Sequence, residues 1–219
     1  MKRIKWKILI ITSVICLLPI IVGLFYYNQL PDQVPIHFDI NNQPDNYATK
    51  EFAVFGLPIF MMLIQAVLCV ISDISNKEEN KYKITTIAKC IIPMLTIVIY
   101  FMTIGIALGY NNIDVRKIVC FCLGIIFVLI GNYIPKVDQN MAYQTGLNLP
   151  NLYIKQLDEK NFRKISRITG YSYILLGILT IISLFFKPIY TLLAIGLIIL
   201  VSIILTIYAF YLSKKDKDK

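Results

Sequence analysis

The sequence predicts an all-α membrane protein with six transmembrane helices. Hydrophobic residues make up 57% of its 219 residues and charged residues only 16%, which is too apolar for a water-soluble domain of this length. The apolar residues occur in continuous runs, and a helix needs about 20 such residues to cross the hydrocarbon core of a bilayer. Because only helices and closed barrels satisfy all backbone hydrogen bonds in lipid, these runs predict transmembrane helices.

Six segments are long and apolar enough to be spans. They are residues 8–27, 52–72, 86–109, 118–134, 168–186 and 188–212. The last two nearly touch at Lys187 and Pro188, which predicts a tight helical hairpin. Pro19, Pro58 and Pro93 lie within spans, where proline predicts a kink.

The first span follows a basic start, as a secretion signal does. Its apolar stretch is too long for the apolar part of a signal peptide, and no small residues mark a cleavage site after it. We therefore interpret it as an uncleaved span, with Tyr26 and Tyr27 as anchors at the membrane surface.

The distribution of Lys and Arg predicts that both termini are cytoplasmic. With the N-terminus inside, four of the 22 basic residues fall in outer loops: Lys50, Arg116, Lys117 and Lys187. Lys89 lies near the inner end of the third span, where its side chain can reach the surface. All the others lie in cytoplasmic segments, where they meet anionic lipid. We expect a bacterial plasma-membrane protein whose partner is the lipid bilayer, with no direct nucleic-acid binding.

Two loops are longer than the other connectors. Residues 28–51 are predicted to lie outside the cell and residues 135–167 inside it. We divide the chain into an N-terminal two-helix region, 1–83, which includes the outer loop, and a four-helix region, 84–219, which includes the inner loop.

The predicted spans contain almost no ionisable side chains. Apart from Lys89, no Asp, Glu, Lys, Arg or His falls within them. Ion-coupled transporters and pumps place such groups at mid-membrane, so this pattern disfavours that class. Gln65 is an amide within a span, and we expect it to hydrogen-bond between helices, a ligand contact being the alternative.

No motif predicts catalysis or a bound cofactor. The chain has no glycine-rich phosphate loop, serine nucleophile motif or His-Glu-x-x-His helix, and Cys120 and Cys122 lack the spacing and partners of a metal site. The one histidine, His37, has several acidic neighbours, but a single histidine with scattered carboxylates is weak support for zinc. We therefore predict no enzyme activity, no cofactor and no metal site.

The outer loop is predicted to form a short extended cap. Residues 34–40 alternate between apolar and other side chains, as in a strand with one buried face. The apolar set is Val34, Ile36, Phe38 and Ile40. Asn41 and Asn42 follow and tolerate the positive φ of a tight turn. We expect Phe38 to point inward and His37 to lie with Asp39, hydrogen-bonded to it or to backbone.

We assign ligand recognition to this outer loop. The candidate residues are Pro31, Pro35, His37, Phe38, Asp39, Asp45 and Lys50. The two prolines fix φ and favour extended geometry in the residues before them, which would hold the loop in one conformation.

The outer loop resembles the N-terminal domain of unknown function of SdpI-like bacterial membrane proteins. The matching run is Leu30-Pro31-x-x-Val34-Pro35-x-His37-Phe38-Asp39, followed by Asp45, Tyr47 and Lys50. That family has a Gly after the Asn of the turn, where this chain has Asn42.

The second half resembles the same family, so the motifs together cover most of residues 26–180. The matching residues are Gly131, Asn132, Pro135, Lys136 and Asn140 at the end of the fourth span, Gly146 and Pro150 in the inner loop, and Phe162, Arg163, Lys164, Arg167 and Gly170 at the entry to the fifth. Three loop positions depart from the family: Asn148 replaces an Arg, Asn151 a Trp and Ser166 a His.

The resemblance implies an immunity function. SdpI-like proteins protect the producing cell from a secreted membrane-active peptide and can relay its presence to a cytoplasmic transcriptional regulator. It implies a peptide toxin as the partner of the outer loop and a regulator as the partner of residues 135–167. A membrane transporter or accessory subunit is the alternative function.

The end of the inner loop is predicted to be a basic amphipathic helix start. Asp158 can cap it, with Phe162 on one face and Arg163, Lys164 and Arg167 on another. Anchoring to the lipid surface is the simpler interpretation of this pattern, and contact with a regulator is the other.

Overall fold

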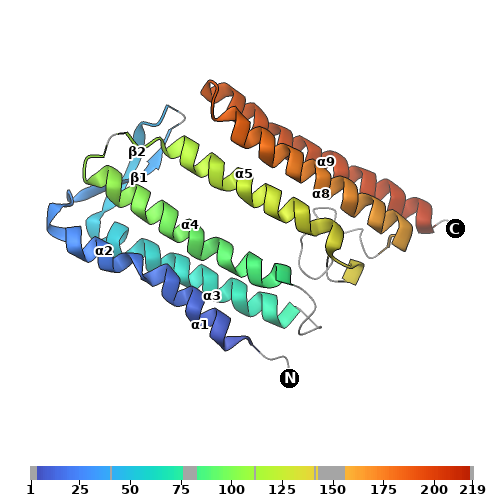
Figure 1. The fold of residues 1–219 in the computed structure, drawn as a ribbon, viewed down its shortest axis with the longest axis horizontal. Coiled ribbons are helices and arrows are strands. Elements are labelled where there is room, and N and C mark those ends of the chain that lie inside the picture. The colour runs from blue at the N-terminus through green and yellow to red at the C-terminus, as the bar shows by residue number, and fades with distance from the viewer. Residues whose placement is uncertain are drawn as a thin grey trace. The chain divides into compact units, whose positions relative to one another are not determined.

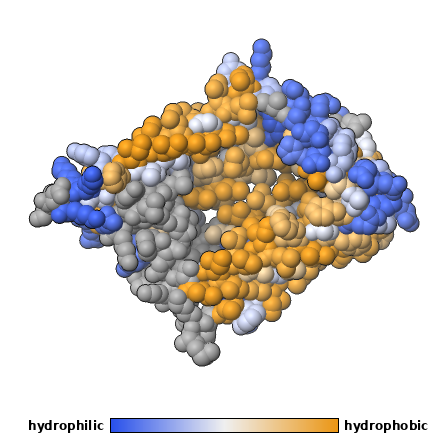
Figure 2. All heavy atoms as spheres, turned by 180° about the vertical axis from the view of Figure 1, so that it is seen from behind, coloured by the Kyte–Doolittle hydropathy of each residue, from blue (hydrophilic) through white to orange (hydrophobic). Residues whose placement is uncertain are grey.

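The computed structural model describes residues 4–39, 41–75, 83–110, 112–140, 142 and 156–217. Within this part of the chain, six helical segments are long and apolar enough to cross a membrane, which confirms the predicted fold class. They are Trp6–Gln29, Phe52–Ile74, Ala88–Ala107, Val115–Lys136, Glu159–Ser183 and Pro188–Lys217. Figure 2 shows apolar side chains along the lengths of helices and hydrophilic ones near their ends, as expected for spans in a bilayer.

The chain folds into two compact units, Met1–Arg116 and Lys117–Lys219. The third span belongs to the first unit because its helix packs against helices of the first two spans. The division into sequence regions 1–83 and 84–219 stays a prediction.

The first span contains two helices, α1 (Trp6–Leu17) and α2 (Pro19–Tyr26), followed by the 3₁₀ turn η1 (Tyr27–Gln29) (Figure 1). The break falls at Pro19, which has no N–H to donate and so interrupts the helical ladder, as predicted.

The outer loop contains two strands, β1 (Gln33–Phe38) and β2 (Pro44–Thr49), which pair antiparallel. A π-helical turn, η2 (Phe52–Gly56), then leads into α3 (Leu57–Ser75). The third span lies in α4 (Lys83–Ala107), which continues through Pro93.

Three long helices of the first unit, α1, α3 and α4, pack against one another. A buried cluster of Leu30, Val54, Tyr100 and Ile104 holds the base of the outer hairpin to the helices. The Tyr100 hydroxyl donates to the Val54 carbonyl oxygen at 3.4 Å. A polar group buried in this cluster thus has a hydrogen-bond partner, as burial requires.

The second unit contains all but the first two residues of α5 (Val115–Tyr133), the 3₁₀ turn η3 (Ile134–Lys136), α8 (Glu159–Ser183) and α9 (Pro188–Lys217). The last two pack together as the predicted tight helical hairpin. Helix α8 begins at Glu159, well before the predicted span, because Asp158 caps it by accepting from the Asn161 N–H at 2.6 Å.

Two pairs of glycines bring α5 and α8 into backbone contact. A Cβ on Gly131 would lie 2.6 Å from the Gly170 carbonyl oxygen, and one on Gly177 would lie 2.6 Å from that of Gly124. The space between the two helices at each pair holds a glycine Hα but not a side-chain Cβ, so this close crossing of α5 and α8 depends on glycine. This explains two glycines of the family motifs, Gly131 and Gly170, as packing residues.

Candidate functional site

The outer hairpin forms as predicted, with its turn at Asn41 and Asn42. Asn42 has a φ of 64°, the left-handed conformation expected at this position. Asp39 closes the turn, because its carboxylate accepts from the backbone N–H groups of Asn41 and Gln43, both at 2.8 Å. Asp39 is therefore a turn-forming residue.

The predicted alternation along the first strand is wrong from Ile36 to Phe38, and Ile40, its last predicted member, lies outside the described residues. Val34 is fully buried and Pro35 is buried beside it, whereas Ile36 is 36% exposed and Phe38 half-buried. The cause is a β-bulge: Pro35 pairs with Tyr47 and His37 with Asn46, so Ile36 has no partner in the register. A bulge inserts one residue and shifts the faces that follow.

His37 pairs with Asp45 rather than with Asp39, which corrects the prediction. Its Nδ1 lies 2.5 Å from Asp45 Oδ1, and the two side chains are 67% and 48% exposed. A second register shift, between His37 and Phe38, leaves Asp45 outside the pairing. The bulges therefore bring these two predicted site residues together on the accessible surface of the hairpin.

The open end of the hairpin is closed by Asp32 and Lys50. Lys50 Nζ donates to Asp32 Oδ1 at 2.9 Å, and the Lys50 backbone N–H donates to the Asp32 carbonyl oxygen at 3.1 Å. This side-chain hydrogen bond lowers the pKa of the Asp32 carboxyl and raises the pKa of the Lys50 ammonium. Pro31 lies exposed beside the pair. Lys50 thus has a structural partner in the hairpin.

Asn42 connects the tip of the hairpin to Ile113 and Val115, which also belong to the first unit. Its amide nitrogen donates to the Ile113 carbonyl oxygen at 3.0 Å, and its amide oxygen accepts from the Val115 N–H at 2.8 Å. The sequence prediction did not assign this residue to the site. The signal was its replacement of the family's glycine, since Asn is one of the few other residues that tolerate positive φ.

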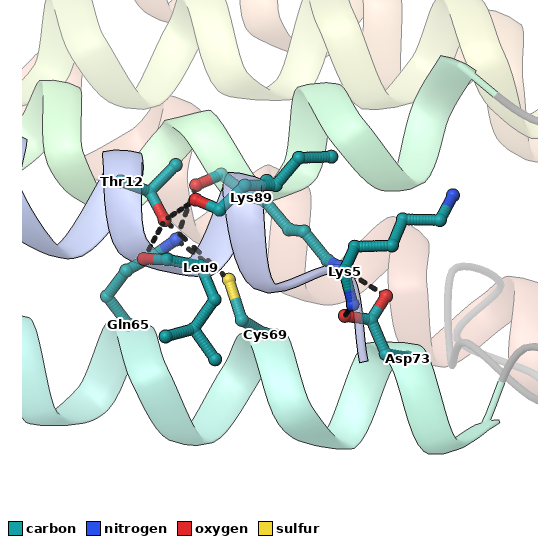
Figure 3. Close-up of polar contacts among 8 residues, drawn as sticks. Lys5, Leu9, Thr12, Gln65, Cys69, Asp73 and Lys89 are labelled. Carbon is teal, nitrogen blue, oxygen red and sulfur yellow. Dashed lines mark hydrogen bonds and ion pairs between the residues drawn. The ribbon is translucent and has the colours of Figure 1, made fainter. Parts of the chain in front are cut away.

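A buried ion pair links α3 and α4 near their inner ends (Figure 3). Lys89 Nζ lies 2.5 Å from Asp73 Oδ1, with side chains 4% and 6% exposed. One prediction is therefore wrong, because the Lys89 side chain does not reach the surface. The segment Phe52–Ile74 also contains an ionisable group, Asp73, in addition to the Lys89 expected in the next span. The predicted second span ended at residue 72, one residue before Asp73, so the sequence prediction did not identify Asp73 as the partner of Lys89.

The same cluster extends to α1. The other oxygen of Asp73 accepts from the Lys5 backbone N–H at 3.0 Å, which caps the N-terminus of that helix. Gln65 donates to the Lys89 carbonyl oxygen at 2.7 Å and to Cys69 Sγ at 3.1 Å, which confirms its predicted interhelical hydrogen bond. Three helices are thus held by one polar cluster (Figure 3).

The inner family motifs meet at a cavity of about 530 Å³ in the second unit. Of the predicted residues, it is lined by Pro135, Lys136, Asn140, Phe162, Arg163 and Arg167, and Ser166 also lines it. Lys164 points elsewhere and donates to the Tyr208 hydroxyl at 2.8 Å. Asn132 accepts from Lys136 Nζ at 3.2 Å.

Some predicted residues lie outside the described part of the chain. They are Gly146 and Pro150 of the inner loop, together with the departures Asn148 and Asn151.

Interactions within α8 and with α9 hold the wall of this cavity. Arg163 forms an ion pair with Glu159 one turn earlier on α8. Asp216, near the end of α9, accepts from the Asp158 backbone N–H at 3.0 Å and from the Asn161 side-chain amide at 2.8 Å. Phe162 is 4% exposed and Arg167 is exposed, as the predicted amphipathic pattern requires.

The described residues offer no metal site of ordinary composition. Among residues 4–39, 41–75, 83–110, 112–140, 142 and 156–217, no three His, Cys, Asp or Glu side chains lie together. His37 instead uses its ring nitrogen to hold Asp45.

Comparison with known proteins gives two matches. A family model described as a domain of unknown function, DUF1648, matches residues 14–62. The immunity protein SdpI of Bacillus subtilis strain 168 is 24% identical over 209 residues, which cover 94% of this chain and 96% of that relative. No solved structure matches the chain. With its six apolar helices, the chain is a multi-pass bacterial membrane protein that is similar over nearly its whole length to the immunity protein SdpI and that matches the DUF1648 model near its N-terminus.

Proposed function

We propose that this protein protects its cell from a secreted membrane-active peptide and does so without catalysis. The observation that carries the proposal is the similarity to the immunity protein SdpI, which extends over 94% of this chain and nearly all of the relative. A match of this extent covers the outer hairpin and the inner motifs together rather than one domain alone, which supports a common function for the two proteins.

We propose the outer hairpin as the surface that recognises the peptide. His37 and Asp45 present a hydrogen-bonding pair beside the exposed side chains of Ile36 and Tyr47. Such a surface offers both polar and apolar contacts to an amphipathic peptide. The hairpin is tied at its open end by Lys50 and at its tip by Asn42, and a preorganised surface loses less conformational entropy on binding.

We propose residues 135–167, which run from η3 into the first turns of α8, as the inner partner surface, where a cytoplasmic transcriptional regulator would bind. Its support is that motif residues from both ends of the segment, among them Lys136 and Arg163, line one cavity. This relay is a separable part of the proposal, since protection alone needs no regulator.

The test is survival of a sensitive bacterium that expresses the chain and is challenged with peptides purified from Bacillus subtilis culture supernatant. We expect protection by the parent chain and its loss in His37→Ala and Asp45→Asn, at unchanged membrane levels by immunoblot. Gln29→Ala changes an exposed polar residue outside the hairpin and should protect fully. No protection by the parent chain would overturn the immunity function, and full protection by both hairpin variants would overturn the role of the hairpin.

The alternative, a transporter, gains one observation from the structure. Asp73 and Lys89 are ionisable groups buried within candidate spans, as coupling residues often are. They neutralise each other, however, and lie near helix ends, where α3 finishes at Ser75 and α4 starts at Lys83. Substrate movement in proteoliposomes, lost on Lys89→Met, would favour this function instead.

A further inference from the structure

We propose that the cavity between η3 and the start of α8 binds a phosphate group, with the headgroup of an anionic phospholipid as its first source and free phosphate as its second. The inference is independent of the immunity function. It rests on where the cavity lies, on its charge and on the pairing of its basic residues.

The cavity lies at the level where two spans meet the membrane surface. Lys136 is the last residue of the span Val115–Lys136, and Arg163 and Arg167 fall in the first turns of Glu159–Ser183. Its volume of about 530 Å³ falls within the range of small-molecule sites, roughly 300 to 1,000 Å³. On the basic, predicted cytoplasmic side, a pocket at this depth faces lipid headgroups.

Three basic side chains line the cavity against two acidic ones. Lys136, Arg163 and Arg167 face Asp138 and Glu159, which leaves a net positive charge. The two arginines are four residues apart and so lie on the same face of α8. Guanidinium groups match phosphate oxygens with two parallel hydrogen bonds, which makes arginine the preferred residue for this anion.

The three cations differ in how they are already engaged. Arg163 is paired with Glu159, and Lys136 contacts Asn132 and the face of the Tyr133 ring. Within the part of the chain that the structure describes, Arg167 forms no side-chain hydrogen bond or ion pair. Arg167 is therefore the residue placed to bind phosphate directly, with Lys136 adding charge from the opposite wall.

The wall behind these groups is suited to a phosphate ester with an apolar remainder. Pro135 and the buried Phe162 line the cavity beside the small, buried Ser166. A diester headgroup has apolar atoms next to its phosphate, whereas inorganic phosphate does not. This composition favours the lipid, whose local concentration in the membrane is also high.

The experiment uses the full chain purified in neutral detergent, with dioleoyl phosphatidylglycerol, dioleoyl phosphatidylcholine and inorganic phosphate as separate probes. Binding is measured as bound adducts by native mass spectrometry and as the shift of thermal unfolding with ligand concentration. We expect phosphatidylglycerol to bind and phosphatidylcholine to bind far more weakly. Loss of one charge-assisted contact in Arg167→Gln should weaken binding about tenfold, and Lys136→Gln should weaken it less.

Two further variants separate a built site from general surface charge. Lys164→Gln removes the same charge from the same turns of α8, but this lysine points to Tyr208, so binding should not change. Glu159→Gln removes a lining carboxylate and releases Arg163, so binding should tighten, which a purely structural role for the cavity would not produce.

Each outcome bears on the proposal. Selective loss in Arg167→Gln together with a gain in Glu159→Gln supports it, and equal binding of inorganic phosphate would identify free phosphate as the source. Equal losses in Arg167→Gln and Lys164→Gln would reduce the effect to surface attraction and overturn it. Absence of binding by both lipid and phosphate, or binding only of an acidic protein segment, would overturn it as well.

Discussion

Lys89 Nζ lies 2.5 Å from Asp73 Oδ1, and this contact joins two helices through side chains that are almost fully buried. The second Asp73 oxygen accepts from the Lys5 N–H, so one carboxylate engages three helices of the first unit. A buried carboxylate or ammonium without its partner is strongly destabilising, because its loss of hydration is no longer compensated.

Lys89→Met should therefore destabilise the protein by about 3–5 kcal/mol, the cost of an unpaired buried charge. The measurement is unfolding of the purified chain in detergent, followed by intrinsic fluorescence. Adding Asp73→Asn to Lys89→Met should recover most of the loss, since Asn still accepts from the Lys5 N–H. Lys7→Met, on an exposed residue of α1, is the control, and equal stability of Lys89→Met and Lys7→Met would contradict a structural role for the pair.

Gly131→Ala and Gly170→Ala should each destabilise the packing of α5 against α8. The new methyl group would lie 2.6 Å from the facing glycine's carbonyl oxygen, so the helices must separate, at a cost of about 1–3 kcal/mol. The measurement is again unfolding in detergent. Gly196→Ala on α9 is a matched control, because a Cβ there meets nothing within 4 Å, and it should leave stability unchanged or slightly raised.

Asn42 variants should separate the conformation of the turn from its connection to Ile113 and Val115. Asn42→Gly keeps the positive φ but loses both side-chain hydrogen bonds, so only the Val115 amide should exchange faster with deuterium. Asn42→Ala adds backbone strain of about 1–2 kcal/mol, so the Asn42 N–H, which donates to Asp39, should also lose protection. Amide hydrogen exchange by NMR or mass spectrometry measures both, and identical patterns in the two variants would contradict this division of roles.

Acidification should loosen the open end of the outer hairpin. Lys50 lowers the pKa of Asp32, and a group with a lowered pKa contributes stability above its unfolded pKa and loses it as the pH falls through its folded pKa. The contribution is therefore constant at neutral pH and is lost below about pH 4. Exchange of the Lys50 amide, whose acceptor is the Asp32 carbonyl oxygen, reports the change, and Asp32→Asn should remove this pH dependence.

The open end of the hairpin should also lose stability at high pH, where the Lys50 ammonium is deprotonated. Asp32 raises the pKa of the Lys50 ammonium, so the stability this group contributes is fully present below its unfolded pKa and disappears as the pH rises through the folded value. An opening of the hairpin between pH 6 and 8 that depends on Asp32 would contradict this account.

The spans were predictable because a continuous apolar run in lipid satisfies its backbone hydrogen bonds by forming a helix. The turn was predictable as well, since two adjacent asparagines before a proline-containing strand tolerate positive φ. The pairing of His37 was not, because two bulges decide it and alternation in the sequence contains no sign of them. Asp73 was missed because a hydropathy pattern ends a predicted span at the first charged residue. Its partner Lys89 lies on the next helix, α4, and the sequence does not show that the two side chains meet.

The inner site was predictable in its residues but not in its geometry. Family motifs gave Lys136, Arg163 and Arg167, which are separated along the chain, but only the contact of η3 with α8 brings them to one cavity. Gly131 and Gly170 belong to the same motifs and yet serve packing. Resemblance alone does not distinguish a residue that binds from one that positions.

The glycine crossing has a consequence for the cavity that lies next to it. Gly131 precedes Pro135 by one helical turn, and Gly170 follows Arg167 by fewer residues still, so both walls are fixed where backbone meets backbone. The glycines themselves have no side chain whose rotamer could change and so widen or narrow the gap. The two helix backbones thus set the distance between the walls, so the cavity has a fixed size for whichever anionic group its basic side chains attract.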